Sequence, residues 1–475
     1  MKKVLIMMLG VLLGIVGCQK QEEEVGCVLD GTQVCYDEEG SFVLEEGAVI
    51  YIGGLEKEFE DALIQMWDAY YPEYKGLIGS TSEKEAYDAA SDLLAQERTY
   101  DIIYTSEEMV TYYLDKLRAW EERVYIIANE NSIAEKIVSP LDQYFIPYSM
   151  DGSAFLYNKT MLEALGIDVE SDEDGNGLPD SIDTWEEIFV LADTWSQEPP
   201  VYKDQKVLVT FPFSLNEMSL SYFMLTSNHF RLFSSNIGND PGFNHQSFVK
   251  ALGFIQEIGK HTMASKEVTT KVDQEVITEI IPYTTEEYIW QWEDVFNHEI
   301  SPFGVVTPWM TYTEAEGYNG VDYVIAPFPT YQGTQQASFV SYNGFAMKAN
   351  TPYPSATNAV MEFLRSEKVM RLFVQYTNEI PYAYQDHSLF FNDDRGEWMD
   401  ALVLGDHISL LALPDNVYVS AMNGYYEIKW IDVLKGLIEQ NFTPEYAASV
   451  IQERYEKWYG EQSSIKGLEI ELGIK

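Results

Sequence analysis

The chain has 475 residues, of which 77 are Asp or Glu and 30 are Lys or Arg, so its formal net charge is −47. This charge excludes nucleic acid as a partner, because a nucleic-acid binder needs a basic surface. The length is sufficient for two or three domains with cores of their own. Because acidic residues are so frequent, a pair of carboxylates seen in the sequence carries almost no information about a site.

The first eighteen residues have the pattern of a targeting segment. Lys2 and Lys3 precede an apolar run that ends at Val16, and Gly17 and Cys18 follow. A basic start, an apolar stretch too short for a stop-transfer helix and a small residue predict a signal peptide over residues 1–17. No second apolar run in the sequence reaches membrane-spanning length.

The end of this segment resembles the lipobox of bacterial lipoproteins. The resemblance implies that the Cys18 thiol receives a diacylglycerol, and two acyl chains hold a protein stably at a bilayer. The mature chain is then expected on the extracellular face of the cell membrane, in contact with lipid through this anchor alone. An ordinary secretory signal followed by a chance cysteine is the alternative.

Residues 18–47 are predicted to form an acidic tether to the anchor. Between Gln21 and Ala48 the chain has nine acidic side chains and no Lys or Arg, which favours an extended, solvated segment. Cys27 and Cys35 flank an Asp-Gly turn that would bring the two sulfurs together. A disulfide between them is expected outside the cytoplasm, and two free thiols are the alternative.

Strand and helix patterns alternate in the first part of the globular chain. Apolar runs at 49–52, 77–80 and 101–104 predict strands, and amphipathic stretches at 59–71, 83–96 and 107–117 predict helices. This alternation predicts a parallel sheet covered by helices on both faces. Ligands bind such sheets at the carboxyl ends of the strands. The residues placed on the rim of a site are Gly53, Gly54, Thr105 and Glu108.

Seven further motifs occur in a fixed order between residues 146 and 383. They are IPYSMDG with FLYNK at 146–159, DTWEE at 183–187, TPW at 307–309, GVDY at 320–323, APFP at 326–329, FVSYNG at 339–344 and IPYA at 380–383. Together they resemble the extracellular solute-binding proteins (family 1) of sugar ABC importers, with the maltose/maltodextrin-binding branch nearest. The likeness extends from Val49 to Tyr459.

The resemblance implies an α/β, two-lobed periplasmic-binding-protein fold of type II, with a ligand cleft between lobes joined by a hinge. The N-terminal lobe is expected at 48–149 and 343–395, and the C-terminal lobe at 150–342 and 396–475. Hinge closure around a ligand is a known switching mode, and the closed form would be read by a membrane permease.

Ligand-binding residues follow from the resemblance by position. Sugar rings pack on aromatic faces, and their hydroxyls need hydrogen-bond partners. The predicted ligand-binding residues are Gly54, Thr105, Glu108, Asp151, Trp309, Tyr342, Tyr425 and Tyr426. The chain departs from the maltodextrin pattern at Gly53–Gly54 and at 105–109, so an oligosaccharide is expected but maltose does not follow. A tyrosine, tryptophan or lone aspartate in an ordinary core or surface role is the alternative at each position.

Residues 172–183 form a separate motif of oxygen-bearing side chains. These side chains occupy positions 1, 3, 5, 9 and 12 of the segment, and a glycine occupies position 6. The pattern resembles the calcium loops of EF-hand and thrombospondin-type repeats. It predicts a structural Ca²⁺ held by Asp172, Asp174, Asn176, Leu178 (through its carbonyl), Asp180 and Asp183. The alternative is an acidic turn in which Asp183 or Thr184 caps the next helix.

The predicted function is a lipid-anchored extracellular receptor of an ABC importer. It would bind an oligosaccharide as a monomer, deliver it to permease subunits and catalyse no reaction. The sequence contains no Gly-x-Ser-x-Gly, His-Glu-x-x-His or P-loop motif. A binding protein for a non-sugar solute, a secreted carbohydrate-active enzyme and a surface adhesin are the alternatives.

Overall fold

The computed structural model describes most of the globular chain. The described ranges are 31–81, 100–125, 143–213, 218–230, 241–262, 265–272, 275–282, 299–307, 321–377, 379–381, 406–409 and 426–472, with residues 215, 232, 396, 401 and 424. Several predicted features lie outside them: the signal peptide, Cys18, Cys27, the helix at 83–96, Trp309 and Tyr425.

The larger sheet of the described chain has eight strands in the order β16-β5-β15-β3-β1-β2, with β4 and β17 also paired to β15. The strands are β1 (Ile50–Gly53), β2 (Ile78–Gly79), β3 (Ile102–Ser106), β4 (Leu117–Arg118), β5 (Phe145–Gly152), β15 (Ala337–Lys348), β16 (Ile380–Pro381) and β17 (Asp406–Ser409). β1 is parallel to β2 and β3, whereas β15 is antiparallel to β3 and β5. The sheet is therefore mixed rather than parallel as predicted, because β5 and β15 also run toward the second sheet.

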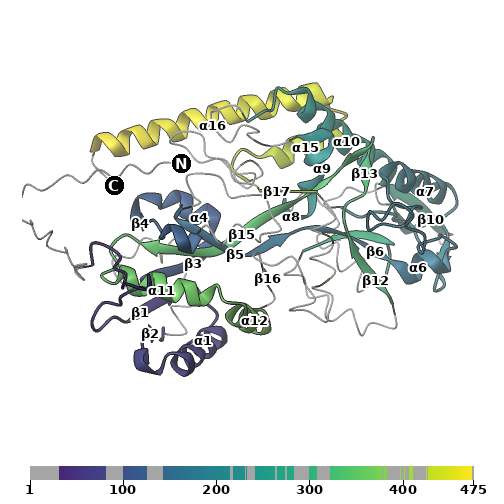
Figure 1. The fold of residues 1–475 in the computed structure, drawn as a ribbon. Coiled ribbons are helices and arrows are strands. Elements are labelled where there is room, and N and C mark those ends of the chain that lie inside the picture. Colours follow the sequence, from purple (N-terminus) through teal and green to yellow (C-terminus); the bar gives the residue numbers. More distant parts are fainter. Residues whose placement is uncertain are drawn as a thin grey trace, which may run out of the picture.

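Helices cover both faces of this sheet (Figure 1). They are α1 (Lys57–Tyr70), α4 (Glu107–Tyr112), α11 (Pro354–Leu364) and α12 (Glu367–Tyr376), with the short 3₁₀ helices η1 (Pro72–Tyr74) and η2 (Leu114–Lys116). Phe59, Leu63 and Trp67 recur at helical spacing and are buried, so α1 packs by the apolar stripe that its sequence predicts. α4 ends at Tyr112, earlier than predicted, because η2 turns the chain into β4.

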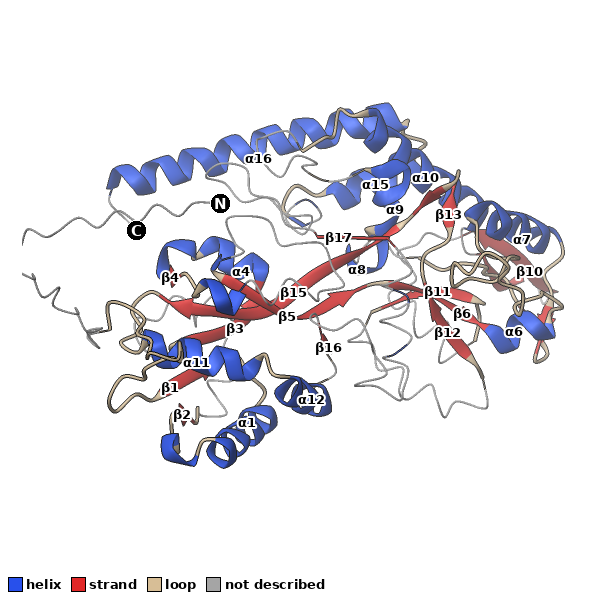
Figure 2. Cartoon of the chain, in the orientation of Figure 1, coloured by secondary structure: helices blue, strands red, loops and turns tan. Residues whose placement is uncertain are grey.

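A second, three-stranded sheet forms the centre of the other lobe, in the order β11-β6-β12 (Figure 2). Its strands are β6 (Ala154–Asn158), β11 (Phe303–Val306) and β12 (Tyr323–Ala326); short hairpins are β7 (Val201–Tyr202) with β8 (Gln205–Lys206), β9 (Ser265–Val272) with β10 (Glu275–Pro282), and β13 (Thr330–Tyr331) with β14 (Thr334–Gln335). The helices are α6 (Lys159–Ala164), α7 (Trp185–Gln197), α8 (Met218–Ser221), α9 (Phe223–Thr226), η4 (Ser227–His229), α10 (Gln246–Thr262), α15 (Trp430–Glu439) and α16 (Pro444–Leu472).

The core of the second lobe is aromatic. Trp185, at the start of α7, is fully buried, and its ring lies 5.0 Å from that of Phe211 and 5.4 Å from that of Phe254. α16 packs on α10 and α15 and extends along one side of the molecule (Figure 1). In the described part of the chain, no helix is both long enough and apolar enough to cross a membrane.

Residues 31–47, here called the N-terminal arm, pack on the first lobe, which is the lobe built around the eight-stranded sheet. The buried Glu45 carboxylate accepts hydrogen bonds from the backbone N–H groups of Ser355 (2.8 Å) and Ala356 (2.9 Å), in the first turn of α11. Cys35 is buried and donates its backbone N–H to the Ser355 hydroxyl at 2.9 Å. The expectation of an extended, solvated tether is therefore wrong for this part, because its polar groups find partners on a folded helix.

Cys35 forms a disulfide, as the sequence predicts. Its partner lies outside the described residues, so the pairing with Cys27 stays a prediction.

Replacing Glu45 by Ala should lower the free energy of unfolding by about 1.5–3 kcal/mol, the usual value for hydrogen bonds to a charged group. The carboxylate also faces the positive end of the α11 dipole, which adds to the loss. Urea denaturation would measure the change. Glu46→Ala is the matched control, since Glu46 is the exposed neighbour; equal losses in the two variants would contradict the assigned role.

Candidate functional site

The two sheets meet where β5 continues through Ser153 into β6. Asp151 lies near the end of β5 and is paired with Ser341 of β15. Gly54 directly follows β1 with φ of +86°, and a Cβ at this position would stand 2.2 Å from the carbonyl oxygen of Tyr104 in β3. The turn after β1 therefore needs glycine for both its conformation and its space.

The carboxylate of Glu379, just before β16, joins the strands at this junction. It accepts hydrogen bonds from the Tyr104 hydroxyl (2.5 Å), the Ser149 hydroxyl and the Asn343 side-chain amide (3.3 Å). Tyr104 is on β3, Ser149 on β5 and Asn343 on β15. Burial, and then the negative charge of Glu379, raises the pKa of Tyr104 well above its usual value. We call Tyr104, Ser149, Asp151, Asn343 and Glu379 the hinge cluster.

Asp151 is the hinge-cluster residue with an unsatisfied polar atom. Its Oδ1 is buried and has no hydrogen-bond partner among the described residues. Burial, and then the nearby Glu379 carboxylate, raises the pKa of Asp151 to about 7, although the backbone N–H of Gly152 opposes the change. Partial burial and the charges of Glu379 and Glu58 also raise the pKa of Glu56, at the N-terminus of α1. The charge of Glu379 therefore contributes to the raised pKa of both Asp151 and Glu56.

The other predicted ligand-binding residues differ in burial and in position. Thr105 is 5% exposed, and its hydroxyl has no hydrogen-bond partner in the described part of the chain. Tyr342 is completely buried, so in this structure it has no exposed surface to offer a ligand. Glu108 lies in the first turn of α4, and Tyr426 is 48% exposed with its hydroxyl oxygen 3.5 Å from the Met218 backbone N–H. The assignment of these residues to a ligand site stays a prediction.

Sequence reasoning missed four members of the hinge cluster. Ser149 and Asn343 lie within the IPYSMDG and FVSYNG motifs, and Glu379 directly precedes the IPYA motif. Tyr104 ends the apolar run at 101–104 that predicts a strand. The motifs are thus the signal that could have directed attention to Ser149 and Asn343. Nothing local distinguishes Glu379 from the other carboxylates of this acidic chain.

The loop at 172–183 brings three carboxylates together. Oxygens of Asp172, Asp174 and Asp180 all lie within 4.8 Å of one another. The Asp172 carboxylate also accepts hydrogen bonds from the backbone N–H groups of Gly175 (2.8 Å) and Gly177 (3.2 Å), so the loop wraps around it. Such a set of carboxylates fits the oxygen ligands that Ca²⁺ prefers.

The other predicted calcium ligands, Asn176, Leu178 and Asp183, are joined to this group of carboxylates by hydrogen bonds within the loop. The Asn176 side-chain amide donates to Asp174 (3.1 Å) and, at 3.4 Å, to Asp183. Asn176 Oδ1 in turn accepts the backbone N–H of Leu178 at 2.8 Å. The cap of α7 is Thr184, which forms a capping box with Glu187. Asp183 is therefore not required as the helix cap.

Comparisons with known proteins show the fold. No model of a known protein family matches the chain, and no curated protein matches its sequence. The crystal structure of a cyclo/maltodextrin-binding protein complexed with maltotetraose is similar, with a TM-score of 0.60 and 14% sequence identity. The match covers 86% of this chain and 96% of the other chain. It confirms the predicted α/β fold of solute-binding proteins.

Proposed function

We propose that this protein is a solute receptor that binds an oligosaccharide between its two lobes and catalyses no reaction. The observation that carries the proposal is the fold, which matches that of a maltotetraose-bound protein over 86% of the chain. The hinge cluster supports it, because polar groups from β3, β5, β15 and the residue before β16 converge where the lobes join. When the two lobes close around a ligand, the polar side chains of the hinge cluster would come into contact with it.

Each part of the junction would have its own role in binding. Asp151 would accept a hydrogen bond from a sugar hydroxyl, which would satisfy its buried Oδ1. Glu379 would position the site by holding three strands in register, since Tyr104, Ser149 and Asn343 already donate to it. Trp309 would supply an aromatic face for a pyranose ring, as its place in the Thr-Pro-Trp motif suggests.

The delivery step and the location belong to the same proposal. The lipobox-like end of the signal segment would anchor Cys18 to the extracellular face of the membrane. The N-terminal arm would then keep the first lobe close to that membrane, because it is packed on α11 rather than extended. A permease of an ABC importer would receive the sugar there.

A melting-temperature screen tests the binding proposal. The purified protein would be heated with gluco-, xylo-, manno- and chito-oligosaccharides, and with amino acids and polyamines as non-sugar solutes. A ligand at 100 times its dissociation constant adds about 2.7 kcal/mol to stability, so one sugar series should raise the melting temperature by several degrees. A response to a non-sugar solute, with a flat sugar panel, would sink the carbohydrate assignment. Asp151→Ala should abolish the response if the ligand binds at the hinge.

We also infer that the loop at 172–183 binds a structural Ca²⁺. The ligand set would comprise Asp172, Asp174, Asn176, Leu178, Asp180 and Asp183, and the convergence of three of these carboxylates supports it. When bound, the ion would neutralise the repulsion between these carboxylates. The ion would thereby pin the segment between α6 and α7 of the second lobe.

A further inference from the structure

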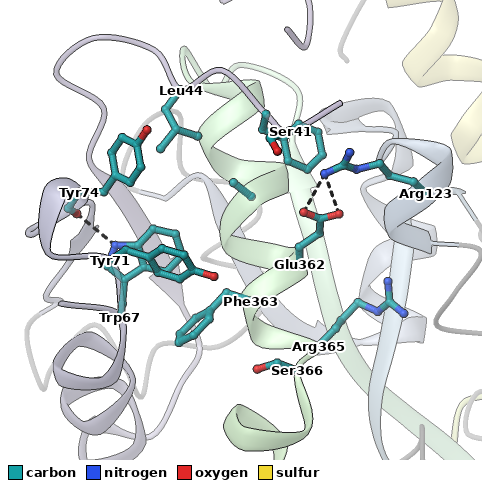
Figure 3. A pocket seen from close by; sticks show the side chains of 12 residues that line it. Ser41, Leu44, Trp67, Tyr71, Tyr74, Arg123, Glu362, Phe363, Arg365 and Ser366 are labelled. Atoms are coloured by element: carbon teal, nitrogen blue, oxygen red, sulfur yellow. Dashed lines mark hydrogen bonds and ion pairs between the residues drawn. The ribbon is translucent and has the colours of Figure 1, made fainter. Parts of the chain in front are cut away.

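A pocket of about 580 Å³ lies on the first lobe, among α1, η1, α11 and the N-terminal arm (Figure 3). Its volume falls within the range of small-molecule sites. No hinge-cluster residue lines it. The lining residues include Trp67, Tyr71, Tyr74 and Phe363 on one side and Arg123 and Glu362 on the other.

One wall of the pocket is aromatic, and its rings pack against one another. The rings of Trp67 and Tyr71 lie 4.6 Å apart, and Phe363 meets the Trp67 ring edge-on at 5.2 Å. Trp67 Nε1 donates a hydrogen bond to the carbonyl oxygen of Tyr74 at 3.1 Å, which ties the end of α1 to η1. Tyr71 is 36% exposed and Tyr74 is 45% exposed. The wall therefore offers apolar ring faces with polar edges to the solvent.

The opposite wall carries two arginines and one glutamate, and each of these groups already has a hydrogen-bond partner. Arg123 and Glu362 form an ion pair at 2.8 Å, and both side chains are partly exposed (Figure 3). The Arg123 guanidinium also stacks 4.0 Å from the Phe42 ring, and Arg365 donates a hydrogen bond to the carbonyl oxygen of Val124. The Arg123–Glu362 pair is neutral as a whole, and the Arg365 guanidinium leaves this wall with one net positive charge. The wall offers hydrogen-bonding groups to a polyhydroxylated ligand, and a neutral one suits it because the net charge of −47 on the chain disfavours an anion.

We propose that this pocket is a second carbohydrate-binding site, which takes a pyranose unit of a neutral glycan. The C–H face of the ring would pack on Tyr71 and Tyr74, and its hydroxyls would bond to the exposed edges of Arg123 and Glu362. A site of this kind on an anchored receptor would hold a glycan chain near the hinge site. This role rests on the proposed function, whereas binding in the pocket does not.

The test compares binding of neutral polysaccharides by the full-length purified protein and its variants. Affinity electrophoresis through gels with soluble starch, xylan, mannan or hydroxyethyl cellulose measures retardation in each. The Tyr71→Ala/Tyr74→Ala double variant should bind the retarding glycan about ten-fold more weakly, a loss of about 1.4 kcal/mol, because both exposed ring faces are removed. The control is Tyr446→Ala, because Tyr446 is a 52% exposed tyrosine on α16 of the other lobe.

An Asp151→Ala variant separates the two sites. The Asp151→Ala variant should lose the rise in melting temperature with oligosaccharides but still be retarded in the glycan gels. The double tyrosine variant should keep the rise in melting temperature but be retarded less. Failure of the hinge proposal alone would leave the pocket result intact. Retardation that disappears with Asp151→Ala would assign all glycan binding to the hinge and overturn the second site.

Other results would also overturn the second site. No retardation by any of the four glycans, or equal retardation of the double variant and the Tyr446→Ala control, would refute it. Tighter capture of a proline-rich peptide than of any glycan would make the pocket a peptide site. If the double variant fails to fold, Glu362→Gln tests the polar wall instead, and unchanged binding by this variant would count against the proposal.

Discussion

An Asp151→Asn variant is expected to be more stable than the parent protein at pH 8, by up to about 4 kcal/mol. In the folded protein the pKa of Asp151 is about 7, well above its usual 3.8, because the carboxyl is buried beside Glu379. At a pH between 3.8 and about 7, the Asp151 carboxyl keeps its proton in the folded state but has released it in the unfolded state. Stability is therefore lost as the pH rises toward 7, and a neutral amide avoids that loss.

Urea denaturation at several pH values would measure this effect. The difference between variant and parent should be near zero below about pH 4, where both states are protonated, and should level off above about pH 7. Asp115→Asn, at an exposed aspartate outside the hinge cluster, is the control. A constant difference across the pH range would show that folding does not change the pKa of Asp151, which would contradict its raised value.

Calcium is expected to raise the melting temperature of the protein by several degrees. Extracellular calcium modules bind with dissociation constants of about 10⁻⁴–10⁻³ M, so 10 mM calcium would reach up to about 100 times that constant and add about 2.7 kcal/mol. The converging carboxylates of Asp172, Asp174 and Asp180 repel one another without the ion. Chelation should therefore return the protein to the lower melting temperature.

Variants in the loop identify where the calcium acts. The Asp172→Asn/Asp174→Asn double variant should melt at the same temperature in calcium and in chelator. Glu173→Gln is the matched control, because Glu173 lies in the same loop, is exposed and occupies no ligand position; it should respond as the parent does. A parent protein that melts identically with calcium and with chelator would refute the site.

The elements of the first lobe were predictable because their signals are local. The apolar run before Gly53 and the helical spacing of Phe59, Leu63 and Trp67 identify β1 and α1. The antiparallel pairing of β5 with β15 was not predictable from the alternation of strands and helices, because that pattern describes only elements that follow one another in the sequence. β5 and β15 pair across almost two hundred residues of chain, and this pairing made the sheet mixed.

The N-terminal arm is folded against α11 although its acidic composition predicts a solvated chain. Its acidic residues favour a solvated chain, yet Glu45 is buried because its carboxylate meets the N–H groups at the start of α11, 310 residues away. The free energy of that contact depends on a helix end that the arm's own sequence does not describe.

The sequence by itself determined the alternating strands and helices, the predicted fold class, and the positions of Gly54 and Asp151 beside the junction. Only the tertiary structure decided which groups meet there. Glu379 and Tyr104 are 275 residues apart, and their contact exists because β16 pairs with β5 while β5 and β3 both pair with β15. A hydrogen-bonded carboxylate is defined by its donors, and the register of four separate chain segments brings those donors to Glu379.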